Sequence, residues 1–163
     1  MMEWISQVSE WLQTWLSPSA GLWGLFFSAF LSATVLPGSS EVVMTVLVTA
    51  YPELAWTALL VATCGNLTGA ALTFGMGLAG RQRYERFQRV RVDENKPLIQ
   101  KLRRLGPPAL VLSILPLVGD ALVLAAGWFR MPFWQCMLWI ALGKGGRYLL
   151  LVLGLKGLLS FGA

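Results

Sequence analysis

Four ionisable side chains stand inside long apolar stretches of the sequence: Glu41, Asp120, Lys144 and Arg147. A charge at the centre of a bilayer costs about 2.5–3.5 kcal/mol even on the lenient insertion scale, so such residues face one another or a water-filled cavity. Lys144 and Arg147 are three residues apart and share one face of a helix. An arginine fork beside a lysine ammonium is suited to binding a phosphate group.

The two acids are candidates for proton coupling. A change in the protonation of Glu41 or Asp120 would change its attraction for the basic pair and so release a bound anion. Nearby polar side chains and helix-start amides would add hydrogen-bond donors. The phosphate-binding candidates are therefore Arg147, Lys144, Ser39, Ser40 and Asn66. The alternative is that the four charges pair two by two and only hold helices together, since buried ion pairs need not stabilise more than apolar packing does.

The composition excludes a soluble domain. Of 163 residues, 56% are hydrophobic and 13% are charged, with a mean hydropathy of +0.62. In soluble chains about 45–50% of the residues are apolar and about 25% are charged. The sequence contains no histidine. This excludes Ser-His-Asp triads, acid–base catalysis by imidazole and the histidine nucleophile of membrane phosphatases. Cys64 and Cys136 lie in apolar runs, as buried thiols do. We expect no metal, no cofactor and no enzymatic activity.

Proline and glycine interrupt two of the apolar stretches. The first, residues 21–51, breaks at Pro37 and Gly38, and the second, which starts at Pro107, breaks at Pro116 and Gly119. Each arm is then shorter than the about 20 residues that a full crossing needs. We therefore predict two re-entrant helical hairpins, each with a non-helical tip that lines a cavity or faces protein.

Each hairpin precedes a segment long enough to span, at about 55–80 and 133–155. A hairpin returns the chain to its own side and a span carries it across, so the second unit is inverted relative to the first. The predicted fold is a single all-α integral membrane domain over 1–163, with inverted repeats at 21–80 and 107–160. Gly65 and Gly69 form a ridge of small residues for close helix approach.

Two flanking segments set the predicted topology. Residues 1–17 place tryptophans on one helical face, which is typical of an amphipathic helix lying in the interface. Residues 81–106 form a loop with nine basic and three acidic residues. The positive-inside rule places this loop in the cytoplasm and both termini outside, and the apolar flanks favour this interpretation over nucleic-acid binding.

Several short motifs, in this order, resemble those of the DedA family, also called the VTT-domain or SNARE-associated Golgi-protein family, and most closely its short bacterial YqaA-like branch. They are Leu36–Val43, Gly65–Gly69, Leu115–Asp120, Ala126–Trp128 and Gly143–Tyr148. The resemblance implies opposed re-entrant hairpins in the bacterial inner membrane. It also implies movement of undecaprenyl phosphate or phospholipids between leaflets, coupled to proton motive force.

The resemblance, together with the central charges, therefore implies a multi-pass flippase for an anionic lipid that uses protons, with membrane lipids as its partners. The alternatives are a proton-coupled transporter of small ions or solutes, or a non-transporting membrane assembly protein. Two hairpins and two spans make a small unit, so a homodimer would be one way to enclose a path.

The topology can be tested by cysteine-accessibility labelling at residues 2 and 95. We expect a membrane-impermeant reagent to reach residue 2 from outside and residue 95 only from the cytoplasm. The reverse pattern would contradict the predicted orientation.

Overall fold

The computed structural model describes residues 17–34, 39–88, 106–115 and 118–161, and within them the secondary structure is entirely helical. The elements in chain order are α2 (Pro18–Ser32), α3 (Ser39–Ala50), η1 (Pro52–Leu54), α4 (Ala55–Gln88), η2 (Pro107–Ile114), α6 (Val118–Trp128) and α7 (Phe133–Phe161). The described residues leave out three predicted features: the amphipathic helix at 1–17 except for Ser17, the breaks at Pro37, Gly38 and Pro116, and most of the basic loop. Gly119 is in the first turn of α6.

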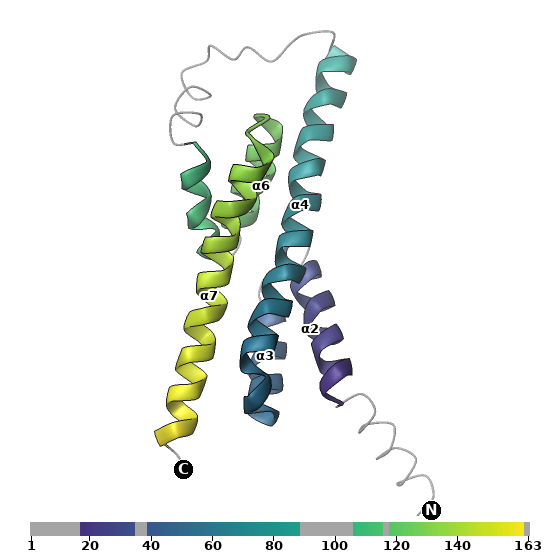
Figure 1. Cartoon of the computed structure of the whole chain (residues 1–163). Helices are drawn as coiled ribbons and strands as arrows, with labels where there is room; N and C mark the ends of the chain where they lie inside the picture. The colour runs from purple at the N-terminus through teal and green to yellow at the C-terminus, as the bar shows by residue number, and fades with distance from the viewer. Residues whose placement is uncertain (1–16, 35–38, 89–105, 116–117, 162–163) are drawn as a thin grey trace, which may run out of the picture.

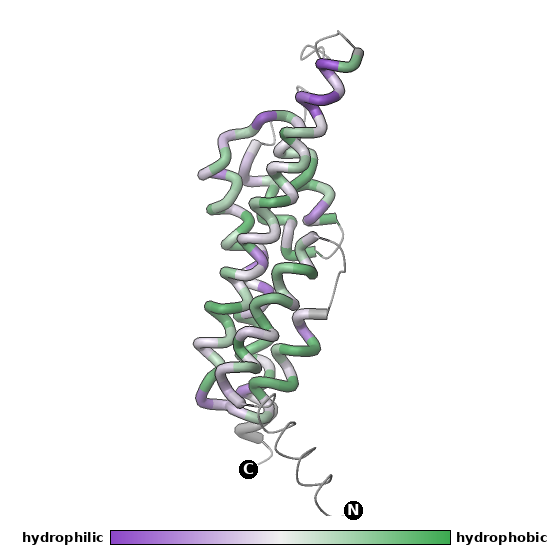
Figure 2. Tube along the Cα trace, turned by 90° about the vertical axis from the view of Figure 1, so that its right-hand side faces the viewer, coloured by the Kyte–Doolittle hydropathy of each residue, from purple (hydrophilic) through white to green (hydrophobic). Residues whose placement is uncertain are grey.

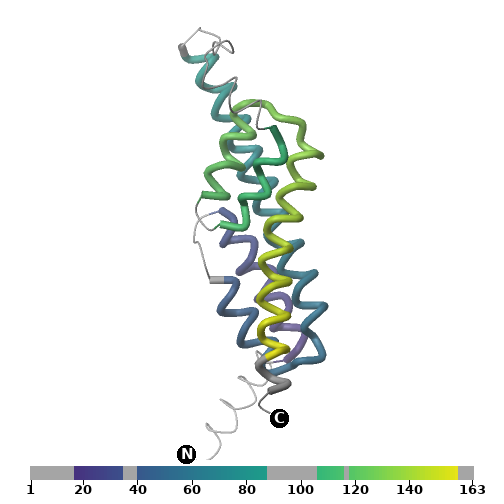
Figure 3. Tube along the Cα trace, turned by 90° about the vertical axis from the view of Figure 1, so that its left-hand side faces the viewer, coloured from purple at the N-terminus to yellow at the C-terminus, as the bar shows by residue number. Residues whose placement is uncertain are grey.

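Two long helices run the length of the bundle, and two pairs of short elements occupy opposite halves of it. α4 and α7 are the long helices, and they run in opposite directions (Figure 1). α2 and α3 lie beside the first half of α4, whereas α6 lies beside its second half and η2 packs against α6 and the first half of α7 (Figures 1 and 3). The short pairs therefore start from opposite ends and turn back near mid-height.

α2 and α4 show how local sequence sets helix ends. Ser17 caps α2 by accepting a hydrogen bond from the Ala20 amide at 3.4 Å, with Pro18 at the first helical position, where its missing N–H costs nothing. α4 continues to Gln88, past the predicted end of the span at residue 80. No glycine or proline follows Gly80 in this stretch, and arginine, glutamine and glutamate favour helix.

The first arm of the second short pair is a 3₁₀ helix, η2, where the sequence predicted one arm of an α-helical hairpin. Gly106 starts it with a φ of 60°, a conformation that glycine adopts readily. Pro107 and Pro108 then lack backbone donors. The turn predicted at 130–132 is present, and Arg130 adopts a φ of 53° after α6.

The apolar core is divided into two clusters, one in each half. The first joins α2, α3 and the start of α4 to the later part of α7, and includes Leu25, Met44 and Val152. The second joins the later part of α4 to η2, α6 and the start of α7, and includes Phe74 and Ile140. Each short pair is thus held to both long helices by its own cluster.

The outer surface is also apolar. Large hydrophobic side chains are exposed along the bundle, for example Trp23 and Leu60 at more than three-fifths of their area, and hydrophobic residues cover most of its length (Figure 2). α4 and α7 are long and apolar enough to cross a membrane. An apolar exterior of this extent is what a lipid environment requires and what water opposes.

Glycines allow α4 to approach both short pairs closely. A Cβ at Gly65 or Gly69 would lie 2.5 Å from a backbone carbonyl of α2, which confirms the predicted ridge of small residues. On the second half, a Cβ at Gly77 would collide with the Leu124 carbonyl of α6, and one at Gly127 with the Phe74 carbonyl of α4. Backbones that touch in this way leave no room for a methyl group.

An ionic cluster lies at the end of the bundle where α4 passes the turn between α6 and α7. Glu85 binds Arg81 of the same helix at 2.8 Å and Arg130 of the α6–α7 turn at 3.0 Å. Arg81 also donates to the Trp128 carbonyl at 3.3 Å. These contacts fix the helical extension of α4 to the end of α6.

The close contact at Gly77 can be tested against a neighbour. We expect Gly77→Ala to lower stability by about 1–3 kcal/mol, because the methyl group meets α6 backbone that cannot move aside. Gly75→Ala is the matched control, since no described residue lies within 4 Å of its Cβ position, and it should be neutral or mildly stabilising. Thermal unfolding of the purified protein in detergent measures both, and equal midpoints would contradict the packing.

Candidate functional site

A chain of polar side chains crosses the bundle between the two apolar clusters. Lys144 of α7 is its most buried charge, with a side chain only 4% exposed. Its ammonium donates to Asp120 Oδ1 at 2.7 Å and to Asn66 Oδ1 at 2.6 Å. The carboxylate and the amide together compensate a charge that would be very costly alone in an apolar interior.

Asn66 connects Lys144 to Tyr148 through two hydrogen bonds. Lysine only donates hydrogen bonds, so the amide oxygen of Asn66 must face Lys144 and the amide nitrogen must face the other way. That nitrogen donates to the Tyr148 hydroxyl at 2.6 Å. Tyr148 and Ser40 of α3 are both fully buried, and their hydroxyls lie 2.8 Å apart. Since Tyr148 accepts from Asn66, its own proton is available to Ser40.

The second ion pair is looser than the first. Arg147 Nε lies 3.1 Å from Glu41 Oε1, but the two are not aligned for a hydrogen bond, and Arg147 Nε is buried without an acceptor among the described residues. The Glu41 side chain is 39% exposed and that of Arg147 is 17% exposed. The guanidinium also lies over the Tyr148 ring, 5.4 Å from its centroid, within reach of a cation–π attraction.

The two acids occupy equivalent places. Glu41 is the third residue of α3 and Asp120 is the third residue of α6, so each lies in the first turn, where the helix dipole favours a negative charge. These first turns begin the second arm of each short pair, near mid-height of the bundle (Figure 1). α7 therefore binds one short pair through Arg147 and the other through Lys144.

The site lies close to the middle of the apolar stretch of α7. Lys144 is 11 residues after the start and 13 before the end of the apolar stretch Phe133–Gly157. At about 1.5 Å per residue these separations are about 16 Å and about 20 Å. A hydrocarbon core is about 30 Å thick, so the polar chain would lie deep within it.

The structure brings together most of the residues selected from the sequence. Glu41, Asp120, Lys144, Arg147, Asn66 and Ser40 form one connected group. Nothing is described of the Ser39 side chain. Asn66 was a phosphate-binding candidate from the sequence. In the structure its amide oxygen accepts a hydrogen bond from Lys144 and its amide nitrogen donates one to Tyr148.

Sequence reasoning assigned no role to Tyr148, which joins the two halves of the site. One signal was present, because Tyr148 follows Lys144 by four residues and so lies on the same helical face. A tyrosine hydroxyl buried in an apolar run usually has a partner. Gly143 adds a second constraint, since a Cβ there would lie 2.6 Å from the Ser113 Oγ atom and from the Val111 carbonyl of η2.

The bridging role of Tyr148 can be measured directly. We expect Tyr148→Phe to cost about 1–3 kcal/mol, because the Asn66 amide and the Ser40 hydroxyl lose a buried partner. Tyr84→Phe is the control, as Tyr84 is exposed on α4, and it should change stability by less than about 0.5 kcal/mol. Thermal unfolding in detergent reports both, and a wild-type midpoint for Tyr148→Phe would contradict the bridge.

Comparisons with known proteins agree with this architecture. The VTT domain model matches residues 36–156. An uncharacterized protein of Haemophilus influenzae is 42% identical over 137 residues, which cover 78% of this chain and 83% of that protein. The inner membrane proteins YqaA of Escherichia coli and of Shigella flexneri are each 36% identical over 134 residues, covering 82% of this chain and 89% of theirs. No solved structure matches significantly. The resemblance seen in the sequence is thereby confirmed, and the chain belongs to the VTT-domain (DedA) family as a YqaA-like membrane protein.

Proposed function

We propose that this protein moves an anionic lipid, such as undecaprenyl phosphate or a phospholipid, between the two leaflets of a bacterial inner membrane. The observation that carries the proposal is Arg147, a cation near the middle of an apolar bundle whose buried Nε has no aligned acceptor within the part of the chain that the structure describes. A phosphate oxygen would supply that acceptor in the bidentate geometry that guanidinium groups favour. Lys144, on the same helical face, would add a second positive charge.

The proposed architecture is an inverted repeat of two re-entrant hairpins. It is supported by the two short pairs in opposite halves of the bundle (Figure 3), and by the acids at the third residue of α3 and of α6. The described ends of α2 and α7 lie at one end of the bundle and the end of α4 lies at the other (Figure 1). With the basic segment 81–106 in the cytoplasm, both termini would lie outside. The membrane would be the inner membrane, in which the YqaA relatives are named.

Proton coupling would act through the acids. While Glu41 is ionised it holds Arg147, and an incoming phosphate competes with it for the guanidinium. Protonation of Glu41 removes that competition and favours phosphate binding, and loss of the proton restores the pair and expels the phosphate. Asp120 and Lys144 would repeat this exchange for the other hairpin. Each cycle thus links the movement of one anion to the movement of protons, without an enzymatic step.

One observation favours a second candidate. All four central charges have a partner of opposite sign, as a purely structural arrangement would require. On that alternative the protein is a membrane assembly protein, and the ion pairs only fix the short helical pairs against α7.

Reconstitution separates the two candidates. Purified protein in liposomes with labelled undecaprenyl phosphate or a labelled anionic phospholipid should move the label between leaflets, and a pH gradient should change the rate. Protein-free liposomes give the background. Movement at the background rate with both lipids would contradict the proposal.

Variants then test the site itself. We expect Glu41→Gln and Arg147→Ala to lower the transport rate by at least about tenfold, equivalent to about 1.4 kcal/mol, while leaving the fold intact. Glu53→Gln and Arg83→Ala are the controls, because both residues are exposed and far along the chain from the site. Full activity in a well-folded Arg147→Ala protein would leave only the structural pairing.

A double variant makes the distinction sharper. If the Glu41–Arg147 pair only holds α3 against α7 within a protein that transports lipid, Glu41→Gln combined with Arg147→Gln should recover the transport that either single variant loses, because no unpaired charge remains. If Arg147 binds phosphate, the double variant should stay inactive. The transport rate in the same liposomes gives the answer.

A further inference from the structure

Two buried side-chain atoms in the described part of the chain lack a hydrogen-bond partner, Ser113 Oγ of η2 and Arg147 Nε of α7. Arg147 belongs to the proposed anion site, whereas Ser113 does not. We infer that the Ser113 hydroxyl is a further ligand of that site and donates a hydrogen bond to the phosphate group of an anion that Arg147 also binds. The inference rests on the proposed function and deepens it.

Ser113 lies between the two elements that carry the Asp120–Lys144 ion pair. A Cβ at Gly119 of α6 would be 2.6 Å from the Ser113 Cα atom, and one at Gly143 of α7 would be 2.6 Å from its Oγ atom. These two glycines directly precede Asp120 and Lys144, whose side chains contact each other at 2.7 Å. The end of η2 therefore lies beside this ion pair, with its hydroxyl against α7.

The register of α7 brings Arg147 toward the same place. Arg147 follows Gly143 by four residues, so the two lie on one face of the helix, about 6 Å apart along its axis. Long side chains in a helix lean back over the turn N-terminal to their own Cα atom, and for Arg147 that turn includes Gly143. Hydrogen bonds of about 2.8 Å to two oxygens of one phosphate can bridge donors at about this separation.

Packing alone does not require a hydroxyl at this place. In the first half of the bundle Gly65 of α4 packs against α2, as Gly143 of α7 packs against η2, and a Cβ at Gly65 would lie 3.2 Å from Ala29 Cβ. An alanine therefore serves at that contact. Ser113 is only 1% exposed and has no acceptor among the described residues, and a buried hydroxyl without a partner lowers stability. A ligand explains the serine where packing does not.

The two unpartnered atoms select an anion. The Nε of arginine can only donate a hydrogen bond, and a serine hydroxyl has one proton to donate, so a shared ligand must accept both. A phosphate group has several acceptor oxygens, and its charge is opposite to that of Arg147. A metal cation would instead be repelled by the positive charges of Lys144 and Arg147.

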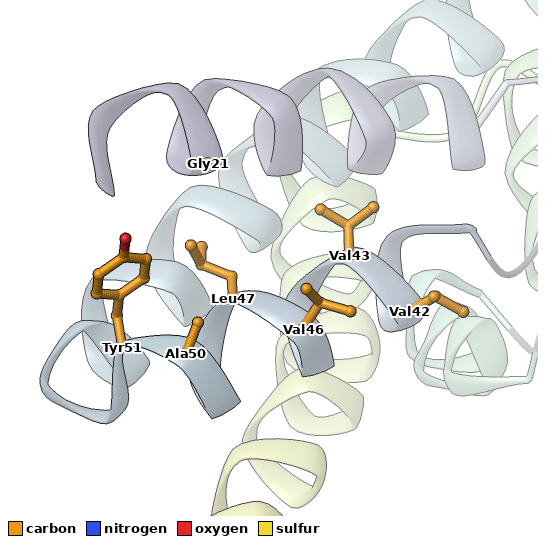
Figure 4. Close-up of a pocket in the computed structure, with 7 residues that line it drawn as sticks. All are labelled: Gly21, Val42, Val43, Val46, Leu47, Ala50 and Tyr51. Carbon is orange, nitrogen blue, oxygen red and sulfur yellow. The ribbon is translucent and has the colours of Figure 1, made fainter. Parts of the chain in front are cut away.

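The apolar pockets do not offer this anion another place. One pocket runs along α3 from Val42 to Tyr51, with Gly21 of α2 opposite (Figure 4), and another lies between η2 and α6. Neither Ser113 nor any of the four central charges belongs to either lining. A phosphate there would lose its hydration with no positive charge to compensate it.

The end of η2 must move for the hydroxyl to meet an anion, because Ser113 is covered by its contacts with Gly119 and Gly143. η2 is a 3₁₀ helix that ends at Ile114, and Leu115 after it is extended. The hydrogen bonds of a 3₁₀ helix have poorer geometry than those of an α-helix, so its last turn shifts at lower cost. The described structure is then the state before the anion binds.

Binding measurements on Ser113→Ala test this assignment. The full-length protein in detergent is titrated with inorganic phosphate, with a short-chain phosphatidic acid and with the diacylglycerol that has the same chains. We expect the wild type to bind phosphatidic acid and not diacylglycerol. Ser113→Ala should weaken this binding by at least about tenfold, equivalent to about 1.4 kcal/mol. Its unfolding midpoint without ligand should stay equal or rise, because the variant removes a hydroxyl that has no partner.

Thr73→Val is the matched control. The Thr73 hydroxyl is also buried, but it donates to the Ala33 carbonyl at 3.0 Å. Its removal should lower the unfolding midpoint, since the Ala33 carbonyl loses a donor, and should leave the affinity for phosphatidic acid unchanged. The two variants are thus expected to show opposite patterns of stability and binding.

A double variant tests whether both side chains bind one phosphate. In an Arg147→Gln protein, Ser113→Ala should have much less effect on the affinity than in the wild type, because residues that share a ligand are not additive. Fully additive losses would show two separate sites and overturn the inference.

The outcomes separate this inference from the proposed function. Wild-type affinity in a well-folded Ser113→Ala protein would show that the hydroxyl holds only an internal water, and a lowered midpoint would show a structural partner; either result overturns the inference, even if the protein moves lipid. Absence of binding by the wild type to both phosphate probes would also overturn it. Ser113-dependent binding of inorganic phosphate alone, in a protein that moves no lipid, would support the inference and contradict lipid transport.

Discussion

The structure depends on the need to compensate the Lys144 ammonium inside an apolar bundle. An uncompensated charge in such surroundings is far more costly than any single packing contact is favourable. Lys144 therefore requires Asp120 and Asn66 at hydrogen-bond distance, and Asn66 in turn requires Tyr148 and, through it, Ser40. This sequence of requirements ties four helices together at one level, so the polar chain fixes their relative heights.

Glycines let the helices approach one another closely enough for these polar contacts to form. A short side chain such as that of Asp120 can contact α7 only if α6 comes close, and α6 is held against α4 by backbone contacts at Gly77 and Gly127. On the other half, Gly65 and Gly69 bring α2 equally close to α4. The two apolar clusters then close around the polar chain from both ends. Packing and polar contacts thus specify the same arrangement, which is the consistency expected of a sequence that encodes one fold.

Much of this was visible in the sequence because hydrocarbon makes polar residues conspicuous. A charge inside an apolar run and a proline in its middle are strong signals, so Glu41, Asp120, Lys144 and Arg147 and the interrupted segments were all found. Which acid meets which base depends on the rotation of α7, and that rotation is set by contacts between distant segments. The role of Tyr148 escaped for the same reason, because its partners Asn66 and Ser40 come from distant segments. The 3₁₀ geometry of η2 escaped because it leaves no distinct periodic signature in an apolar stretch.

The register of α7 has a consequence for how such chains can vary in length. Arg147 and Lys144 reach different short pairs from one rigid helix, and one helical turn contains about 3.6 residues. An insertion or deletion of one residue between Lys144 and Arg147 would rotate one of them relative to the other by about 100°, so one of the two ion pairs would be lost while the other stayed. Changes of length are therefore tolerable in the segments that join the elements but not between Lys144 and Arg147, because this spacing fixes the position of each short pair along α7.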